Sequence, residues 1–126
     1  MSRILVAEDD DAVRDFVRRA LEHRTHEVTA VPDGGAAVQL LFADGLAFDL
    51  LLADIRMPVM DGIALALKVA RDLPTLPVLL MTGFADQRER ADALQAIICG
   101  VVQKPFTLAQ ITGAVEKALG TAPGKA

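Results

Sequence analysis

Several residue types that mark particular classes of protein are scarce in this chain. It has one cysteine, Cys99, which excludes an internal disulfide and fits a reducing cytoplasm. Cysteine and histidine pairs at zinc-ligand spacing are also missing. No apolar run is long enough to cross a membrane. The first residues, Met1 to Arg3, enter an apolar segment directly, so a signal peptide is not expected either.

Excess positive charge is absent as well. The net charge is -4 and the isoelectric point is about 5.0, which argues against sequence-independent binding of nucleic acid. The 126 residues are 52% hydrophobic and 24% charged, enough apolar material for one buried core. We therefore expect one domain over residues 3–119 and a flexible C-terminal tail over residues 120–126.

What the sequence does contain is a regular alternation of short apolar segments and segments with helical spacing. Strands are expected at 3–7, 27–31, 50–53, 78–81 and 101–103, and helices over 13–21, 36–42, 63–73, 87–97 and 108–119. Five such strand–helix units predict an α/β fold, a doubly wound (βα)5 arrangement with a parallel sheet. Continuous apolar character makes the first, third and fourth strands central, whereas Glu27 and Thr29 suit an edge. The favoured sheet is flavodoxin-like and five-stranded, with order 2-1-3-4-5.

Polar residues follow the expected strands at the ends where such folds bind ligands. Glu8 and Asp9 follow the first strand, Asp54 the third, Thr82 the fourth and Lys104 the fifth. Three carboxylates crowded at one edge should attract a cation, and hard oxygen ligands favour Mg²⁺. A divalent cation with a lysine beside a carboxylate suits a phosphoryl group, for which the carboxylate can be the nucleophile.

Four motifs in this order resemble the receiver domain of bacterial two-component response regulators. The resemblance runs from Arg3 to about Leu119, and it is specific because every motif falls at an expected strand end. The motifs are Glu8-Asp9, Asp54-Ile55-Arg56-Met57-Pro58-Val59-Met60-Asp61-Gly62, Thr82-Gly83 and Lys104-Pro105-Phe106.

The resemblance implies a signalling domain whose chemistry is limited to its own phosphorylation and dephosphorylation. Asp54 would accept a phosphoryl group from a histidine kinase or a histidine phosphotransfer protein. Thr82 and Lys104 would bind the phosphoryl oxygens, and a cis peptide bond is implied before Pro105. Mg²⁺ would be held directly or through water by Glu8, Asp9, Asp54 and the backbone carbonyl of Arg56.

One position departs from the family pattern. Receivers usually carry Tyr or Phe three residues before the lysine, where the ring turns inward on phosphorylation, but here that position is Val101. The chain has no tyrosine, and Phe84 is our hypothesis for a substitute. Phe84, Val101 and Phe106 are the expected switch and output residues. They belong to the face of the fourth helix, fifth strand and fifth helix. The protein is expected to be a monomer, or a weak dimer that pairs through this face.

Partners are also implied. The histidine kinase or phosphotransfer protein should contact Val13, Arg14 and Pro105, which surround Asp54. No further module follows the expected receiver, so output is expected through a protein partner. The runs 6–11 and 82–85 are similar to single-domain cell-cycle receivers of alphaproteobacteria. That similarity implies an adaptor for a AAA+ protease, ClpXP, active while unphosphorylated and located in the cytoplasm.

Two other functions stay open. The first is a phosphate shuttle within a phosphorelay, which needs a downstream histidine protein and a short-lived acyl phosphate. The second is a small Mg²⁺-dependent phosphatase with an aspartate nucleophile. Such phosphatases want a second aspartate two residues after the nucleophile, and Arg56 occupies that place, which makes this the weakest of the three functions.

Overall fold

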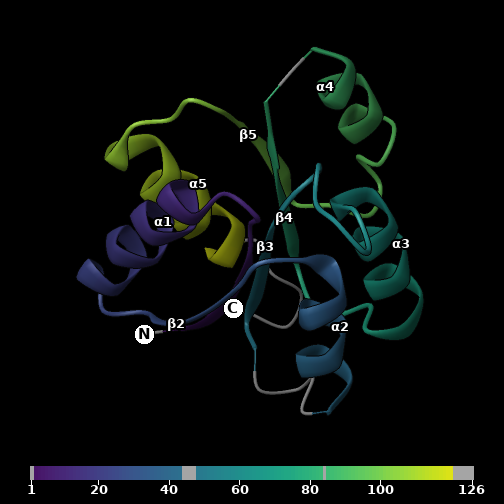
Figure 1. Cartoon of the computed structure of the whole chain (residues 1–126), viewed down its shortest axis with the longest axis horizontal. Helices are drawn as coiled ribbons and strands as arrows, with labels where there is room; N and C mark the ends of the chain where they lie inside the picture. The colour runs from purple at the N-terminus through teal and green to yellow at the C-terminus, as the bar shows by residue number, and fades with distance from the viewer. Residues whose placement is uncertain (1, 44–47, 84, 121–126) are drawn as a thin grey trace.

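The computed structural model describes residues 2–43, 48–83 and 85–120 of the chain. Five strands and five helices alternate through these residues (Figure 1). The elements are β1 (Arg3–Ala7), α1 (Asp11–His23), β2 (Glu27–Val31), α2 (Gly34–Ala43), β3 (Leu50–Asp54), α3 (Gly62–Asp72), β4 (Val78–Thr82), α4 (Ala85–Asp92), β5 (Gly100–Gln103) and α5 (Leu108–Gly120).

All strand pairs are parallel, and the sheet order is β2-β1-β3-β4-β5. This confirms the predicted flavodoxin-like α/β fold. The residues of β3 and β4 are buried throughout, as their continuous apolar sequences indicated, whereas β2 at the edge alternates between exposed and partly buried positions. Because the strands are parallel, all five carboxyl ends lie at one edge of the sheet.

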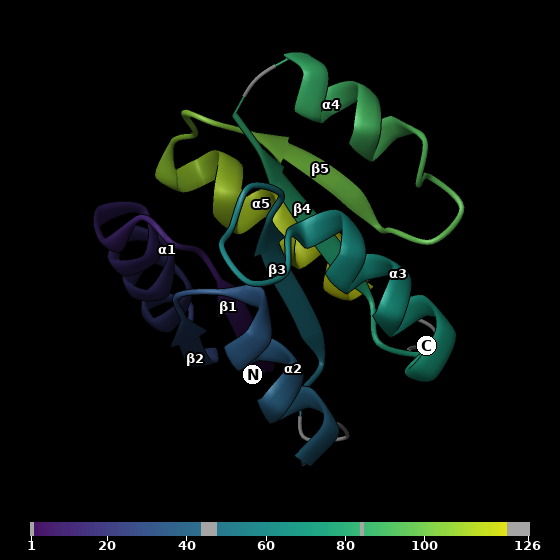
Figure 2. The same ribbon diagram turned by 45° about the vertical axis from the view of Figure 1, so that its right-hand side comes forward.

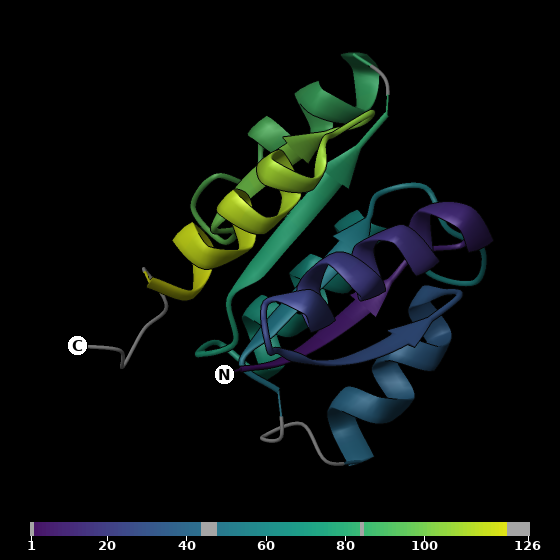
Figure 3. The same ribbon diagram turned by 90° about the vertical axis from the view of Figure 1, so that its left-hand side faces the viewer.

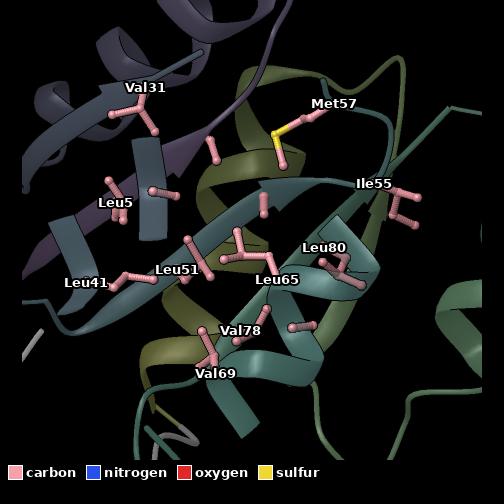
Figure 4. Packing of buried hydrophobic residues seen from close by; sticks show 14 of the residues in the cluster. Leu5, Val31, Leu41, Leu51, Ile55, Met57, Leu65, Val69, Val78 and Leu80 are labelled. Carbon is pink, nitrogen blue, oxygen red and sulfur yellow. The ribbon is translucent and has the colours of Figure 1, made fainter. Parts of the chain in front are cut away.

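Helices cover both faces of the sheet, so there are two separate layers of core. Helices α1 and α5 lie on one face, and α2, α3 and α4 lie on the other (Figures 1 and 3). Figure 4 shows the layer under α2 and α3, where Leu41, Leu65 and Val69 pack on Leu51 and Leu80 of the central strands. The opposite layer joins α1 and α5 to the alternate residues of the same strands.

Side-chain caps start four of the helices; before α2, the Asp33 carboxylate accepts from the Ala36 N–H at 2.8 Å. Asp10 accepts hydrogen bonds from the backbone N–H groups of Ala12 and Val13 at 2.9 and 3.2 Å, and it caps α1. Asp61 caps α3 in the same way. At α5, Thr107 and Gln110 exchange backbone and side-chain bonds in a capping box.

The fourth helix differs from the sequence prediction. We expected it over residues 87–97, but α4 begins at Ala85 and ends at Asp92. Beyond it, the N–H groups of Leu94 and Ile97 bond to carbonyls three residues back, at 2.9 and 2.8 Å. These tight turns still place Leu94 against the core, so the apolar spacing that suggested a longer helix is satisfied without one.

The last helix ends one residue later than expected, since α5 includes Gly120. The rest of the predicted tail, residues 121–126, lies outside the described residues. Among the described parts of the chain, no helix is long and apolar enough to cross a membrane.

Candidate functional site

The parallel register brings the predicted site residues to one edge of the sheet. Asp54, the last residue of β3, lies opposite Met81, which immediately precedes Thr82. Thr82 lies opposite Gln103, which immediately precedes Lys104. On the other side of β3, β1 ends just before Glu8. A cleft of about 280 Å³ opens at this edge, lined by Glu8, Asp9, Asp10, Asp54, Arg56, Gly83 and Lys104.

An ion-pair network crosses the cleft. The Lys104 ammonium bonds to Glu8 Oε1 and lies 3.1 Å from Asp54 Oδ2. Glu8 is fully buried and Asp54 is 5% exposed, so both carboxylates are largely removed from water. A buried charge needs a partner, and here one lysine serves two carboxylates. With Asp9 beside them, the site carries more negative charge than Lys104 neutralises.

This imbalance raises the affinity of the site for a cation. Burial raises the pKa of Glu8 to about 7, and the nearby charge of Asp54 acts in the same direction. Hydrogen bonds from Lys104 and from the Asp10 N–H lower this pKa, but by less. Burial also lowers the pKa of Lys104, but its bond to Glu8 and the charges of Asp54 and Glu8 outweigh that and raise it overall. The ammonium therefore stays charged, and the remaining negative charge favours either a proton on Glu8 or a bound cation.

Three carboxylates are close enough to share a metal ion. Glu8, Asp9 and Asp54 each offer an oxygen, and these oxygens lie within 4.8 Å of one another. Glu8 and Asp54 are buried while Asp9 is exposed, so the ligands open to solvent on one side. An all-oxygen set with room for water fits Mg²⁺, which keeps several waters when protein carboxylates bind it. Arg56, whose carbonyl was the fourth expected ligand, lines the same cleft.

Thr82 contributes a hydroxyl that has no hydrogen-bond partner. Its side chain is fully buried, and its Oγ1 is the one buried side-chain polar atom without a partner among the described residues. An unpaired buried hydroxyl costs free energy, so an acceptor that reached it would be bound favourably. The backbone carbonyl of Thr82 meanwhile accepts from the Lys104 N–H at 2.7 Å, which ties together the two strand ends that would bind phosphoryl oxygens.

The loop after Asp54 is held by close backbone contacts. A Cβ added to Gly62 would lie 2.3 Å from the carbonyl oxygen of Asp54, and one added to Gly34 would lie 2.1 Å from that of Met60. The Gly62 N–H donates to the Ile55 carbonyl at 2.8 Å. Both glycines are required because the chain leaves no room for a side chain there.

The expected switch residues are distributed over both faces. Val101 is half-buried and packs in the layer that includes Ala91 of α4. Phe106 packs in the opposite layer and stacks on Phe16 of α1, with 6.3 Å between ring centroids. Phe84 lies outside the described residues.

Two of the three residues expected to contact a kinase line a groove between α1 and the segment after β5. Val13 and Pro105 line it, and the peptide bond before Pro105 is cis, as the resemblance implied. Arg14 is not among its lining residues. The groove encloses about 460 Å³ and is lined by Ala12, Val13, Phe16, Gly83, Lys104, Pro105 and Phe106.

Two further contacts could not be predicted from the sequence. Arg90 of α4 lies 3.1 Å from Asp61, so the cap of α3 also holds an ion pair with α4. Arg14 of α1 reaches back to the β1–α1 loop and donates to the Glu8 carbonyl at 2.9 Å. Nothing in the local sequence of either arginine shows which distant or backbone oxygen its side chain meets.

Comparisons with known proteins agree with this geometry. The family model of the response regulator receiver domain matches residues 4–116. The response regulator receiver protein CpdR of Brucella abortus (strain 2308) is 40% identical over 119 residues, which cover 94% of this chain and 98% of that protein. The regulatory protein AtoC of Escherichia coli (strain K12) is 39% identical, but the match covers only 25% of its length. Among solved structures, the receiver domain of NtrX from Brucella abortus superposes with a TM-score of 0.84 at 27% identity, covering 94% of this chain and 99% of that one.

Proposed function

Because the chain belongs to the response regulator receiver domain family, we propose that Asp54 accepts a phosphoryl group from a histidine kinase or a histidine phosphotransfer protein. The observation that carries this proposal is the Asp54 carboxylate, held 3.1 Å from Lys104 with Glu8 and Asp9 oxygens beside it. In this role the protein is a signalling domain rather than a conventional enzyme.

The proposed reaction is a single phosphoryl transfer. A carboxylate oxygen of Asp54 attacks the phosphorus of a phosphohistidine, the P–N bond breaks, and the imidazole nitrogen keeps the bonding electron pair and takes up a proton. Lys104 stays charged throughout, since its pKa is raised, and it would pair with a phosphoryl oxygen. The Thr82 hydroxyl, which lacks an acceptor, would donate to another oxygen.

Mg²⁺ is the cofactor that this donor set fits. Glu8, Asp9, Asp54 and the carbonyl of Arg56 would hold it, directly or through water. When bound, the ion would neutralise charge on the phosphoryl oxygens. The protein supplies buried carboxylates whose excess charge favours a cation over a proton on Glu8 at neutral pH and above.

Intact-mass measurement after incubation with acetyl phosphate and Mg²⁺ tests the proposal. Wild type should gain one phosphoryl group, and Asp54→Asn should gain none. The matched control is Asp49→Asn, which changes the aspartate just before the opposite end of β3, where it accepts from the Arg3 N–H. Asp49→Asn should be labelled like wild type. Equal labelling of Asp54→Asn, or no labelling of wild type, would reject Asp54 as the acceptor.

The phosphodonor protein would dock on the groove between α1 and the segment after β5. Apolar side chains of Val13, Phe16 and Phe106 line it and Lys104 lies at its side, so a docked helix would bring its histidine toward Asp54. Arg14 and Pro105 complete the proposed contact. Val13→Asp should slow transfer from a phosphorylated histidine phosphotransfer domain and leave labelling by acetyl phosphate unchanged. Equal slowing with both donors would instead indicate damage to the phosphorylation site.

Output would pass through a protein partner in the cytoplasm. The chain covers almost all of CpdR, and the similarity to single-domain cell-cycle receivers supports an adaptor for a AAA+ protease that acts while unphosphorylated. The proposed output residues are Phe84, Val101 and Phe106, and the proposed output surface is that of α4, β5 and α5. Capture of ClpX by wild type and by Asp54→Asn, but not by the phosphorylated protein, would support the adaptor. Rapid transfer of the phosphoryl group from Asp54 to a histidine phosphotransfer domain, without ClpX capture, would favour the shuttle.

A further inference from the structure

Arg14 is turned toward the phosphorylation site rather than toward solvent. Its side chain is 22% exposed, although it belongs to a surface helix. One guanidinium nitrogen, Nη1, donates to the backbone carbonyl of Glu8 at 2.9 Å, and the other, Nη2, pairs with Asp11. The planar guanidinium is thus fixed at both ends, and its donors match two oxygens that lie on either side of it.

The carbonyl that Arg14 binds belongs to the peptide bond between Glu8 and Asp9. The same residue, Glu8, donates its N–H to the Val31 carbonyl at 3.0 Å, so its backbone is held on both sides. The orientation of this peptide plane sets the directions in which the Glu8 and Asp9 side chains leave the backbone. Two of the three carboxylates of the cation cluster therefore flank the peptide that Arg14 binds.

We infer that Arg14 is a positioning residue for the Mg²⁺ site, which it orients through the Glu8–Asp9 peptide without touching the metal. This role rests on the proposed function. It concerns the contact of Arg14 with the protein interior, and the proposed kinase contact concerns its exposed surface. Groups that orient metal ligands from behind typically change metal affinity about 10- to 100-fold when they are replaced. The loss of one charge-assisted hydrogen bond of this kind corresponds to a change in affinity of the same order.

The positive charge of Arg14 acts in the opposite direction, because it repels a cation from the cluster. The pair with Asp11 offsets part of that repulsion, but a neutral replacement would still mix the two effects. Arg14→Lys separates them, since lysine keeps the charge and loses the planar fork that reaches the Glu8 carbonyl and Asp11 together.

The chain offers a matched control on the same helix. Arg18 pairs with Asp15 three residues before it, as Arg14 pairs with Asp11, but its other partner is the Glu22 carboxylate rather than the metal-site loop. Arg18→Lys thus makes the same chemical change in a similar ion pair, away from the β1–α1 loop.

Isothermal titration calorimetry with MgCl₂ on the full chain tests the role. Arg14→Lys should raise the Kd for Mg²⁺ about 10-fold, and Arg18→Lys should leave it within about twofold of wild type. The backbone amide signals of Asp9 and Asp10 should shift in the spectrum of metal-free Arg14→Lys, because the peptide plane before them is released. Melting curves in EDTA report whether each variant is folded before titration.

Every outcome bears on Arg14. An unchanged Kd in folded Arg14→Lys, even with a lower Tm, would overturn the positioning role and leave a purely structural one. An equal loss of affinity in Arg18→Lys would overturn it too, because the effect would then be nonspecific. Absence of Mg²⁺ binding by wild type would reject the metal site of the proposed function together with this role, whereas the first two outcomes leave that function intact.

Discussion

The loop that follows β3 and the helix that follows β4 both start at the acidic cleft, yet they are held in different ways. In the loop, Ile55 and Met57 are buried, and Gly62 presses against the backbone of Asp54. In α4, an eight-residue polar helix, Ala91 is the one buried residue among the side chains described there. Figure 2 shows the loop between β3 and α3 close to the sheet, with α4 lying outside β5.

The difference indicates that the loop is held more rigidly than α4. Close backbone contacts fix the loop so firmly that Val59 keeps a φ of 71°, a value that β-branched residues rarely adopt. Short helices with few apolar contacts open locally at low cost. We therefore expect the edge that carries Asp54 to keep one geometry, and α4 to change position in response to small changes in free energy. Four predictions test this comparison.

The largest effect is expected from a side chain added to the fixed loop. Gly62→Ala would place a methyl group 2.3 Å from the Asp54 carbonyl oxygen, and the obstacle is backbone that cannot rotate away. We expect a loss of about 3 to 4 kcal/mol in the free energy of unfolding, measured by urea denaturation.

The control for this substitution is Gly113→Ala on α5, where an added Cβ meets nothing within 4 Å. Alanine is favoured over glycine inside a helix, so this variant should gain about 0.5 to 1 kcal/mol. A tolerated Gly62→Ala would show that the loop can move, and the contrast with α4 would disappear.

The next effect concerns the charges that the fixed edge holds together. The pKa of Glu8 is raised from 4.5 to about 7 by burial, so the folded protein binds a proton that the unfolded chain releases. The resulting stability is present below about pH 4.5 and is lost as the pH rises through about 7. In EDTA, wild type should lose about 2 to 3 kcal/mol between these limits.

Glu8→Gln should remove most of this pH dependence, because its side chain does not titrate. It should therefore be more stable than wild type at about pH 8 without metal, as measured by urea denaturation across the pH range. Millimolar Mg²⁺ should stabilise wild type far more than Glu8→Gln. A wild-type protein whose stability is flat between these pH values would contradict the raised pKa of Glu8.

The strand ends at the fixed edge could be predicted from the sequence. Continuous apolar runs identified the strands, and the parallel order then placed Asp54, Thr82 and Lys104 at one edge, where the structure has them. Their roles remain predictions. Strand-end residues are predictable because backbone pairing fixes their positions whatever their neighbours are.

What the sequence concealed depends on contacts between distant segments. The charged residues of α4 give little amphipathic pattern, so its bounds were wrong by several residues. The inward turn of Arg14 and the left-handed backbone of Val59 have no local signal either. Each is decided by the surface against which it folds, which a linear pattern does not contain.

A smaller effect is expected at the hydroxyl that the fixed edge leaves without a partner. Thr82→Val replaces a buried, unpaired hydroxyl with a methyl group of similar size, and it should stabilise the unphosphorylated protein by about 1 kcal/mol. Thr112 is the matched control, because it is also buried but donates to the Leu108 carbonyl at 2.8 Å. Thr112→Val should be neutral or destabilising by up to about 1 kcal/mol. Destabilisation by Thr82→Val would mean that the hydroxyl already has a partner in solution.

The smallest effect is expected where the two regions meet. Asp61 caps α3 at the end of the fixed loop, and its other oxygen lies 3.1 Å from Arg90 of α4. Exposed ion pairs contribute about 0.2 to 1 kcal/mol, which is little for the whole protein but significant for a helix with few other contacts. Arg90→Gln should therefore speed hydrogen–deuterium exchange of α4 amides about twofold and leave α3, whose cap is untouched, unchanged.

Arg24→Gln is the control, because it breaks a similarly exposed pair with Glu116 between α1 and α5. Both of those helices are anchored by buried stripes, so their exchange should hardly change. If α4 responds and α1 does not, the same small interaction matters only where packing is weak. That result would indicate that the loop after Asp54 is coupled to α4 through the Asp61–Arg90 pair. This coupling does not involve Val101, the position where the family's aromatic residue is missing. If α4 does not respond, the Asp61–Arg90 pair carries no coupling, and α4 is held by Ala91 and its strand contacts alone.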